Sequence, residues 1–506
     1  MAQGNDNSNK VSAEEYLSYI ISNDLYNLHL HVIDHEITSD LLKFVEVNPD
    51  SFPGIMTEHY FGSSRFQTLP NTLVAAMELH DAVMQKPTKY CGLWKVLGRE
   101  KDLKLTPEGV MKGTRPVLAP EEILTLIAGL YGQIITIGLR KIKDNPFFIG
   151  KSFENRSVES FFEGKAEFDF IINTDFVGFD TTVDRESMLC ACAILRSLFP
   201  SSREYDRMWF FLATSLINKQ VVFPPGIIYE INNGLPSGHP LTSLVGTLVN
   251  YIQWNRALTR AYGEKAVSST RYLWKSQYCG DDARHLLVRV DKILDKINKI
   301  FKEEQPCIIE DVHDSISPLP SSLIGYNSKF LKRCSTYDGL VYWDHKSIIK
   351  KLMFPSRNFK SYFEIQDWIY NWIETAPFDY EMNKFLTDYL LYLLRDFYSE
   401  TYKEIPFFKR RTLITEDLND IIIRGYLRIQ TNMKFFMLNI HRPVRRKVVS
   451  EMVSNVTPVN YPETQLILLT LGVDAFQILK RIDENALRHK ILKVREQLIR
   501  RTRKPP

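Results

Sequence analysis

The 506-residue chain is poor in cysteine, and its six cysteines form no Cys-x-x-Cys pair. The close pair Cys190 and Cys192 has neither a second pair nor a histidine cluster to complete it. This argues against a zinc site and, at this length, against a disulfide framework. No apolar run approaches the ~20 residues that span a bilayer, and residues 1–10 are polar, without the apolar core of a signal peptide. We therefore expect a protein of a reducing compartment with no membrane segment.

Charge of one sign is also scarce, because 64 Lys and Arg residues face 60 Asp and Glu residues, for a net charge of +4. A protein that only coats RNA would carry a larger basic excess, so this balance argues against such a role. Hydrophobic residues make up 44% of the chain, which is ordinary for a globular protein. The length allows two to four domains, or one multi-lobed body with several cores.

Hydrophobic periodicity predicts a mixture of helices and strands. Residues from about 11 to 90 are expected to be mainly helical, for example over 13–21 and 73–84. Helices are also expected over 121–140, 185–198, 241–261 and 291–303, and over much of the chain after 345. Strands are expected over 167–175, 271–279, 284–290, 328–334 and 339–343. The basic stretch 95–115 and the Pro- and Gly-rich stretch 221–240 are expected to be loops.

Two aspartates stand at the end of the expected strand 167–175: Asp175 closes it, and Asp180 follows five residues later. A carboxylate at the end of a buried strand is costly unless something compensates its charge, as a divalent cation would. A helix cap or a turn is an equally ordinary use of aspartate at such a place.

A second acidic motif, Gly280-Asp281-Asp282, lies between two expected strands. Gly and Asp are favoured in turns, so a hairpin turn is the plain interpretation. The apolar flanks at 278–279 and 286–288 would hold both carboxylates at a rigid edge, as a metal site requires.

A third motif, Ser237 and Gly238 followed by Thr242, precedes the expected helix at 241–261. Hydroxyls and exposed amides before a helix can bind phosphate or ribose groups. The alternative is a loop and helix N-cap with no ligand.

In this order, and at intervals of about 60 and 45 residues, the three motifs resemble the palm motifs of viral RNA-dependent RNA polymerases. Residues 175–180 resemble motif A, 237–242 motif B and 280–282 motif C. The helix 291–303 stands where motif D belongs, 330–333 resembles motif E, and 112–115 resembles motif F of the fingers. Motif style and length are most similar to the picobirnavirus and partitivirus polymerases of double-stranded RNA viruses.

The resemblance implies an α+β fold, a right hand whose fingers, palm and thumb close into a ring, with an antiparallel palm sheet backed by helices. The implied parts are 1–164 (N-terminal segment and fingers), 165–198 (palm, motif A), 199–230 (fingers), 231–344 (palm, motifs B to E) and 345–506 (thumb with a basic tail).

It also implies a role for each motif residue. Asp175, Asp281 and Asp282 would be the catalytic ligands of two metal ions, Mg²⁺ by default, with Mn²⁺ able to substitute. The nucleotide-binding residues would be Lys112, Arg115, Asp180, Ser237, Gly238 and Thr242. Asp180 would recognise the ribose 2′-hydroxyl, and Lys332 and Arg333 would lie near the primer-strand backbone.

One position departs from part of the family, since Gly246 stands where picornavirus-like polymerases commonly have an asparagine. Asn250 lies ~12 Å along the helix from Thr242, which makes it a poor substitute. Sugar discrimination is then expected to depend on Asp180, Ser237 and Thr242. The general-acid lysine of motif D is left open among Lys296, Lys299, Lys302 and Lys329.

The implied function is RNA-templated RNA synthesis for the replication and transcription of a viral RNA genome, without a primer. The expected partners are a single-stranded RNA template, nascent RNA and ribonucleoside triphosphates, with a capsid protein as a further candidate. The expected location is the virion interior or the host cytoplasm. The tail 488–506, with eight Lys and Arg and one Glu, would contact RNA phosphates or be a disordered soluble tail.

Two alternatives share some of these features. A reverse transcriptase has the same palm logic, but the Gly-Asp-Asp turn and Asp180 argue against it. An RNA-binding or capsid-associated structural protein, in which Asp281 and Asp282 only form a turn, would bind RNA indifferently to Mg²⁺.

Overall fold

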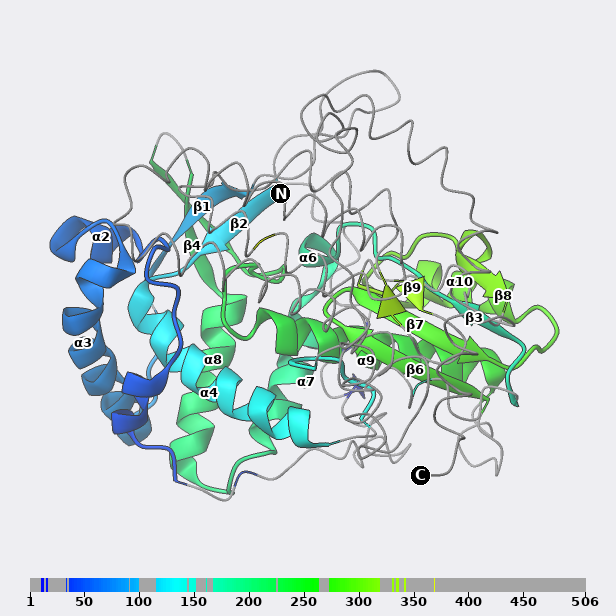
Figure 1. Cartoon of the computed structure of the whole chain (residues 1–506), viewed down its shortest axis with the longest axis horizontal. Helices are drawn as coiled ribbons and strands as arrows, with labels where there is room; N and C mark the ends of the chain where they lie inside the picture. Colours follow the sequence, from blue (N-terminus) through cyan, green and yellow to red (C-terminus); the bar gives the residue numbers. More distant parts are fainter. Residues whose placement is uncertain are drawn as a thin grey trace, which may run out of the picture. The chain divides into compact units, whose positions relative to one another are not determined.

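The computed structural model describes 15 stretches of the chain (Figure 1). They are residues 11–12, 15–16, 33, 36–90, 92–99, 115–142, 145–151, 161, 167–223, 226–263, 273–318, 330–331, 334–335, 341–342 and 368. The chain divides into two units, 1–151 with 164–318, and 152–163 with 319–506. Nearly all described residues belong to the first unit. The division into fingers, palm and thumb stays a prediction, and all of 345–506 except residue 368 lies outside the described residues.

An antiparallel sheet in the order β6-β7-β3-β8 carries the acidic motifs. Its strands are β3 (Phe170–Ile172), β6 (Trp274–Cys279), β7 (Asp282–Leu287) and β8 (Ile316–Pro318). All three residues of β3 are buried, because the strand pairs with β7 on one side and β8 on the other. Bulky apolar side chains suit such a doubly paired position. The strand is shorter than the predicted 167–175.

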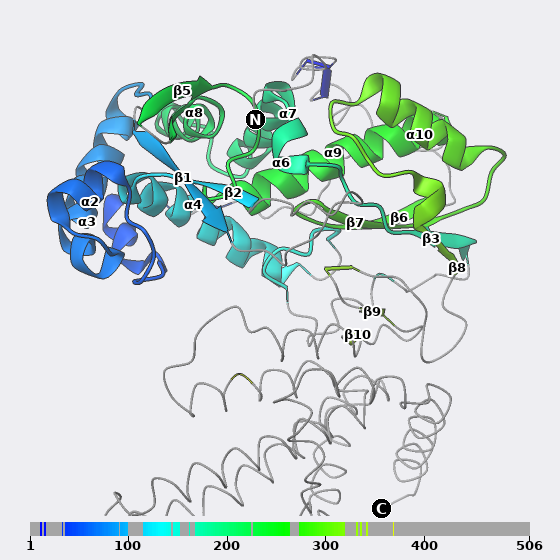
Figure 2. The same cartoon turned by 90° about the horizontal axis from the view of Figure 1, so that it is seen from above.

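Two helices, α9 (Thr242–Tyr262) and α10 (Ile293–Glu304), pack against each other over one face of this sheet (Figure 2). On α10, Ile293, Ile297 and Ile300 are buried at helical spacing. Lys296, Lys299 and Lys302 are exposed on the opposite face, so these three candidates for the motif D acid belong to a solvated surface. Lys329 lies outside the described residues. The prediction of an antiparallel sheet backed by helices is confirmed.

Helix α9 is buried on nearly every side, from Leu244 to Thr259 without interruption. A fully buried helix is expected to be apolar all round. This one also carries six buried polar residues: Thr247, Asn250, Gln253, Asn255, Arg256 and Thr259. Because a buried polar group is costly unless it forms a hydrogen bond, these positions show where α9 is attached to its neighbours.

A second sheet, in the order β2-β1-β4-β5, corrects two predicted loops. It consists of β1 (Leu93–Arg99), β2 (Arg115–Ala119), β4 (Lys219–Phe223) and β5 (Ile227–Ile231). The stretches 95–115 and 221–240 therefore begin as strands. Leu93 pairs in parallel with Gln220, 127 positions later, and such long-range pairing leaves little trace in local sequence.

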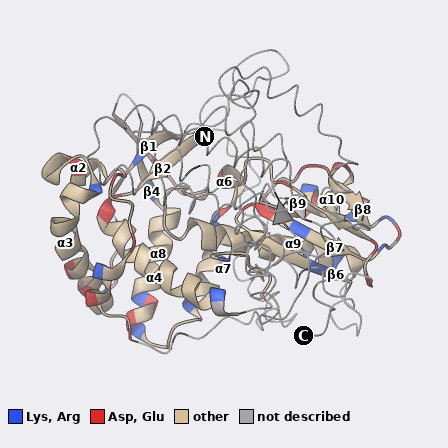
Figure 3. Cartoon of the chain, in the orientation of Figure 1, with Lys and Arg blue, Asp and Glu red and all other residues tan. Residues whose placement is uncertain are grey.

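Among the remaining helices, α3 packs against both α4 and α8, α7 packs against α8 and α9, and η5 packs against α10. The elements are η1 (Ser39–Phe44), α2 (Ile55–Phe61), α3 (Arg65–Gln85), α4 (Glu122–Lys141), α6 (Phe179–Thr182), α7 (Arg185–Arg196), α8 (Arg203–Ile217) and η5 (Val312–Ser315). Helix α8 was not predicted. Basic and acidic side chains are interspersed over these elements (Figure 3).

One described helix is apolar enough to be a candidate membrane span, which the sequence analysis did not find. Glu122–Arg140 within α4 passes a length and hydropathy test for a membrane span, but 67% of that window is buried inside the protein. Core helices of soluble proteins pass the same test, so the finding is weak evidence for a span.

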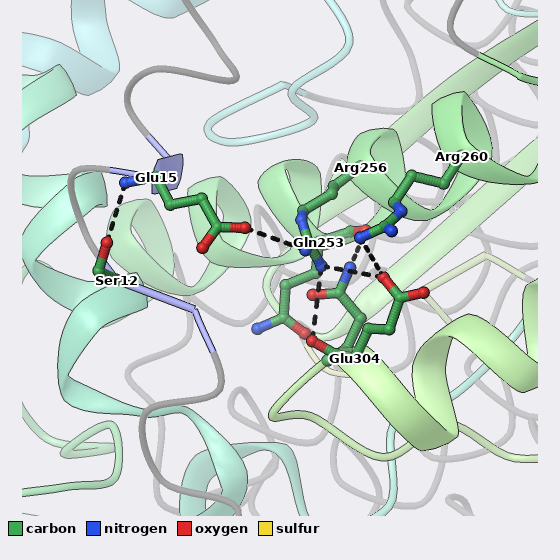
Figure 4. A network of polar contacts seen from close by, with 7 residues as sticks. Ser12, Glu15, Gln253, Arg256, Arg260 and Glu304 are labelled. Carbon is green, nitrogen blue, oxygen red and sulfur yellow. Dashed lines mark hydrogen bonds and ion pairs between the residues drawn. The ribbon is translucent and has the colours of Figure 1, made fainter.

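Polar contacts join the N-terminal segment to α9 and α10 (Figure 4). Arg256 Nη2 lies 3.3 Å from Glu15 Oε1, and Arg256 Nη1 lies 3.8 Å from Glu304 Oε2. Arg260 pairs with the same Glu304 carboxylate. Ser12 Oγ accepts the backbone N–H of Glu15 at 3.1 Å, which shapes the segment locally. The C-terminal half of α9 is thus attached through side-chain charges.

In the second unit, β9 (Cys334–Ser335) pairs antiparallel with β10 (Val341–Tyr342). In the sequence, β9 overlaps the end of the predicted strand 328–334, and β10 lies within the predicted strand 339–343.

Candidate active site

The hairpin β6–β7 presents Asp281 and Asp282 at one end of the antiparallel sheet. Cys279 pairs with Asp282, so Gly280 and Asp281 are the two central residues of the turn. Gly280 has φ 62°, and a glycine with positive φ at the first central position is typical of a type II′ hairpin. The predicted hairpin and its position are confirmed.

Asp175 lies at the same end of the sheet. Ile172 of β3 pairs with His285 of β7 in an antiparallel register. Continuing that register by three residues on each strand brings Asp175 level with Asp282. The Asp175 side chain is exposed, and its Oδ1 accepts the N–H of Phe176 at 3.0 Å.

Asp180, in the short helix α6, is hydrogen-bonded to the Ser-Gly loop. Ser237 Oγ donates to Asp180 Oδ2 at 2.7 Å. The backbone repeats the connection, because the N–H of Leu235 donates to the carbonyl of Asp180 at 2.7 Å. Two motifs separated by 57 positions are thereby joined through both side chain and main chain.

His239 anchors the loop 234–241. Its side chain is buried and stacked on Trp94. Its Nδ1 accepts the N–H of Leu241 at 3.1 Å, so the neutral ring carries its proton on Nε2, 3.1 Å from Ser215 Oγ. Burial lowers the pKa of His239 to about 3, with Lys219 as a lesser cause. The ring is therefore neutral at physiological pH.

Lys219 attaches the same loop to the end of α8. Its ammonium donates to the carbonyls of Leu216 (2.8 Å), Ile217 (3.0 Å) and Gly234 (3.0 Å). Burial lowers the pKa of Lys219 to about 7.

Close backbone approach explains Gly238. A Cβ at this position would lie 2.1 Å from the carbonyl oxygen of Leu118 in β2. Thr242 stabilises the same loop. Its Oγ1 donates to the carbonyl of Pro236, and its N–H donates to the carbonyl of His239 at 2.9 Å. Gly238 and Thr242 thus shape the loop.

A cavity of about 410 Å³ brings the motifs together. Four predicted site residues line it: Asp180, Ser237, Thr242 and Asp281. Its walls also include Ser243, Gly246 and Gly280, and Leu97, Gly98 and Val117 from β1 and β2. Asp175, Asp282 and Gly238 are not part of this lining. Phe179 of α6 and Leu235 line the cavity as well, so polar and apolar side chains alternate on that side, while the β1–β2 side is apolar.

Some predicted site residues fall outside what is described. Lys112, Lys332 and Arg333 lie in undescribed stretches, and Arg115 is described only as the first residue of β2. Val117, two residues later in β2, lines the cavity.

The charge of the turn acts on its neighbour Cys279. Burial and the nearby carboxylates of Asp282 and Asp281 raise the pKa of the Cys279 thiol to about 12. The two aspartates thus create a negative potential at the turn, which favours a cation there.

Residues 75–342, more than half of the chain, match the family model described as viral RNA-dependent RNA polymerase. The chain belongs to this family. A likeness to solved structures agrees, since the Sicinivirus 3Dpol RNA dependent RNA polymerase superposes with a TM-score of 0.52 at 15% identity. The match covers 72% of this chain and 76% of that one. The fold is thus that of the viral RNA polymerases, whose architecture is likened to a right hand.

Two viral proteins are similar in sequence. The RNA-directed RNA polymerase of Cryptosporidium parvum virus 1 (strain KSU-1) is 40% identical over 91 residues, 18% of this chain and 17% of that protein. The genome polyprotein of feline calicivirus (strain F9) is 23% identical over 336 residues, 63% of this chain and 18% of the polyprotein. The matched stretches span less than a fifth of either relative.

The donor set of the viral RNA polymerase motifs suits a divalent metal in kind, because carboxylate oxygens are the ligands hard cations prefer. The geometry is less complete. Among the described residues, no group of three or more His, Cys, Asp and Glu is close enough to hold a metal ion. The Asp175 carboxylate accepts the N–H of Phe176 through Oδ1.

Sequence analysis missed two polar residues of α9 that contact the turn, Thr247 and Asn250. Ser243, Gly246, Thr247 and Asn250 are spaced i, i+3, i+4 and i+7, which is one face of a helix. That spacing was a usable signal.

Proposed function

We propose that the chain catalyses RNA-templated RNA synthesis by two-metal nucleotidyl transfer. The observation that carries the proposal is the cavity shared by Asp281, Asp180, Ser237 and Thr242, which come from three separate motifs. A turn of purely structural use would need no such convergence. Family membership supports the same chemistry.

The metal ligands would be Asp175, Asp281 and Asp282, and the ion Mg²⁺, with Mn²⁺ able to substitute. Bound there, two such ions would activate the 3′-hydroxyl of the growing strand and stabilise the leaving pyrophosphate. Viral RNA polymerases generally use divalent metal ions, which supports this assignment.

Asp180 would select ribonucleotides by accepting a hydrogen bond from the ribose 2′-hydroxyl. Asp180 also contacts the Ser-Gly loop, because Ser237 Oγ donates a hydrogen bond to its Oδ2. With Gly246 supplying no side-chain amide to the cavity, discrimination would depend on this pair and on Thr242.

The motif F residues Lys112 and Arg115 would neutralise the triphosphate, and Lys332 and Arg333 would lie along the primer strand. The partners would be single-stranded template RNA, nascent RNA and ribonucleoside triphosphates, in the virion interior or host cytoplasm, with capsid protein as a further candidate. The virus would have a double-stranded RNA genome, and synthesis would begin without a primer.

The deciding experiment measures incorporation of labelled ribonucleotides on single-stranded RNA with Mg²⁺. Wild type is compared with Asp281→Ala and with Asp291→Ala, an exposed aspartate ten positions further on. We expect template-length product from wild type and Asp291→Ala, and none from Asp281→Ala. Product from Asp281→Ala would exclude it as a required ligand. RNA binding without product from wild type would favour the structural protein.

Two variations test the finer statements. Supplying deoxyribonucleotides instead separates this enzyme from a reverse transcriptase, and Ser237→Ala should narrow the preference for ribonucleotides. Omitting any primer and labelling the γ-phosphate of the first nucleotide tests initiation, because only unprimed product retains that label at its 5′ end.

A further inference from the structure

Three hydrogen bonds from α9 hold the turn that carries the two aspartates. Thr247 Oγ1 accepts the N–H of Gly280 at 2.7 Å. Asn250 Nδ2 donates to the carbonyl of Gly280 at 2.9 Å and to that of Asp282 at 3.3 Å. Both side chains are buried, so water does not compete for these bonds. The three bonds hold the backbone before and after Asp281.

The Thr247 hydroxyl is itself oriented. It donates its only proton to the carbonyl of Ser243 at 2.7 Å, which leaves its lone pairs for the N–H of Gly280. In a two-residue hairpin, the backbone N–H of the first central residue, here Gly280, has no partner in the strand ladder. Thr247 therefore satisfies a donor that the sheet leaves open.

Gly246 also lies beside the turn. A Cβ there would lie 3.0 Å from the Leu235 side chain and 4.0 Å from the Cα of Gly280. The helix face formed by Gly246, Thr247 and Asn250 thus lies directly against the turn, and Gly246 also lines the cavity.

Asn250 is not the residue that stability alone would favour. Its amide donates twice, yet its Oδ1 is buried and has no hydrogen-bond partner among the described residues. An unsatisfied buried acceptor destabilises the folded state, so its presence calls for an explanation. The two donor bonds to the turn supply one.

We propose that Thr247 and Asn250 are positioning residues that fix the Gly280–Asp282 turn so that its carboxylates can bind divalent metal. The inference rests on the proposed function. Two adjacent aspartates repel each other, and a turn free to relax would move them apart. The bonds from α9 oppose that movement.

The test measures metal binding directly, by Mn²⁺ titration of the full chain followed by calorimetry or electron paramagnetic resonance, besides the Mg²⁺ dependence of RNA synthesis. Thr247→Val removes the hydroxyl at nearly constant shape, and Thr247→Ser restores it. Loss of a residue that orients metal ligands typically weakens metal binding about 10- to 100-fold. We expect Thr247→Val and Asn250→Ala to raise the Mn²⁺ Kd by about tenfold or more, and Thr247→Ser to remain close to wild type.

Asn255 provides the matched control on the same helix. It bonds to the same hairpin, accepting from Trp274 Nε1 at 3.2 Å and donating to the Tyr278 hydroxyl at 3.0 Å, but within the strand and away from the turn. Asn255→Ala should lower thermal stability without changing the Mn²⁺ Kd. A Kd shift as large as that of Asn250→Ala would show general loosening and overturn the proposal.

Failure of the proposed function would look different. Wild type would then make no RNA, and its Mn²⁺ binding would not depend on Asp281. If wild type is active and its Mn²⁺ binding depends on Asp281, an unchanged Kd in Thr247→Val and Asn250→Ala overturns the positioning role alone.

Discussion

Two groups of side chains attach α9 to the protein by different chemistry. Toward its N-terminus, Thr247 and Asn250 bond to backbone atoms of the hairpin turn with neutral groups. Toward its C-terminus, Arg256 and Arg260 pair with the carboxylates of Glu15 and Glu304 (Figure 4). A backbone atom held by a short buried side chain has little freedom. A carboxylate at the end of a flexible side chain has more.

The two kinds of contact differ in how strictly they fix the position of the group they bind. Ion pairs to partly exposed carboxylates contribute about 0–1 kcal/mol and tolerate several geometries. Buried neutral hydrogen bonds contribute a similar amount, but losing one partner costs about 1–3 kcal/mol and shifts the group it held. The half of α9 beside the cavity is therefore expected to control position, and the other half to control attachment.

The largest effect is expected from Asn250→Asp. Its carboxylate would place two oxygens against the carbonyls of Gly280 and Asp282, and an uncompensated buried charge costs about 3–5 kcal/mol. Urea unfolding measures the loss. Asn255→Asp should cost less, because the Tyr278 hydroxyl can turn and donate to the new oxygen. Equal losses would contradict the difference between turn and strand.

The next effect concerns pH. Burial lowers the pKa of His239 to about 3, whereas the unfolded chain titrates near 6.5. Between these values the unfolded state binds more protons, so stability present above pH 6.5 is lost as pH falls. The titration of His239 then lowers the free energy of unfolding by about 1.4 kcal/mol for each pH unit below 6.5, or by about 2 kcal/mol at pH 5.

His239→Gln should therefore show a shallower fall of unfolding free energy between pH 6.5 and 5 than wild type. Burial also lowers the pKa of His285 to about 3, and burial raises that of Asp184. Both groups are present in each protein, so the difference in slope reports on His239 together with its neighbour Lys219. Identical slopes would mean that its ring is accessible to protons.

Arg256→Met is expected to lower stability by about 1–2 kcal/mol, because the buried stem is kept while the ion pairs are lost. The Mn²⁺ Kd should change by no more than about twofold, since the site is about 9 Å along the helix from Asn250. A larger change in Mn²⁺ Kd would show that the charged half also controls the turn.

The smallest effect is expected from Glu15→Gln, because the Glu15 side chain is 55% exposed. The change in melting temperature should correspond to less than about 1 kcal/mol at low salt. It should nearly vanish in 1 M salt, where the screening length is about 3 Å. A salt-independent loss would indicate packing rather than charge.

Local patterns predicted the parts of this fold that are determined locally. The hairpin at Gly280 followed from turn chemistry between apolar strands, and the helix beginning at Thr242 followed from its apolar periodicity. Strands β1 and β4 escaped prediction because they pair with each other across 127 positions. Basic residues in one stretch and prolines near the other suggested loops.

The candidate site shows the same limit. The order of motifs identified Asp180, Ser237, Thr242 and Asp281, which the cavity brings together. Asn250 was assessed only for its distance from Thr242 and judged too far from the sugar. Its contact with the turn depends on how α9 lies against the hairpin, which spacing along one helix does not determine.

Cys279, directly before the turn, has a consequence for chemical targeting. Alkylating reagents attack thiolates, and a thiol whose pKa is about 12 is almost entirely protonated at neutral pH. Burial, with the aspartates of the turn as lesser causes, thus protects the Cys279 thiol from alkylation and from oxidation to a sulfenic acid. A cysteine-directed inhibitor aimed at Cys279 would meet a poor nucleophile, so reversible ligands are the better choice against this part of the enzyme.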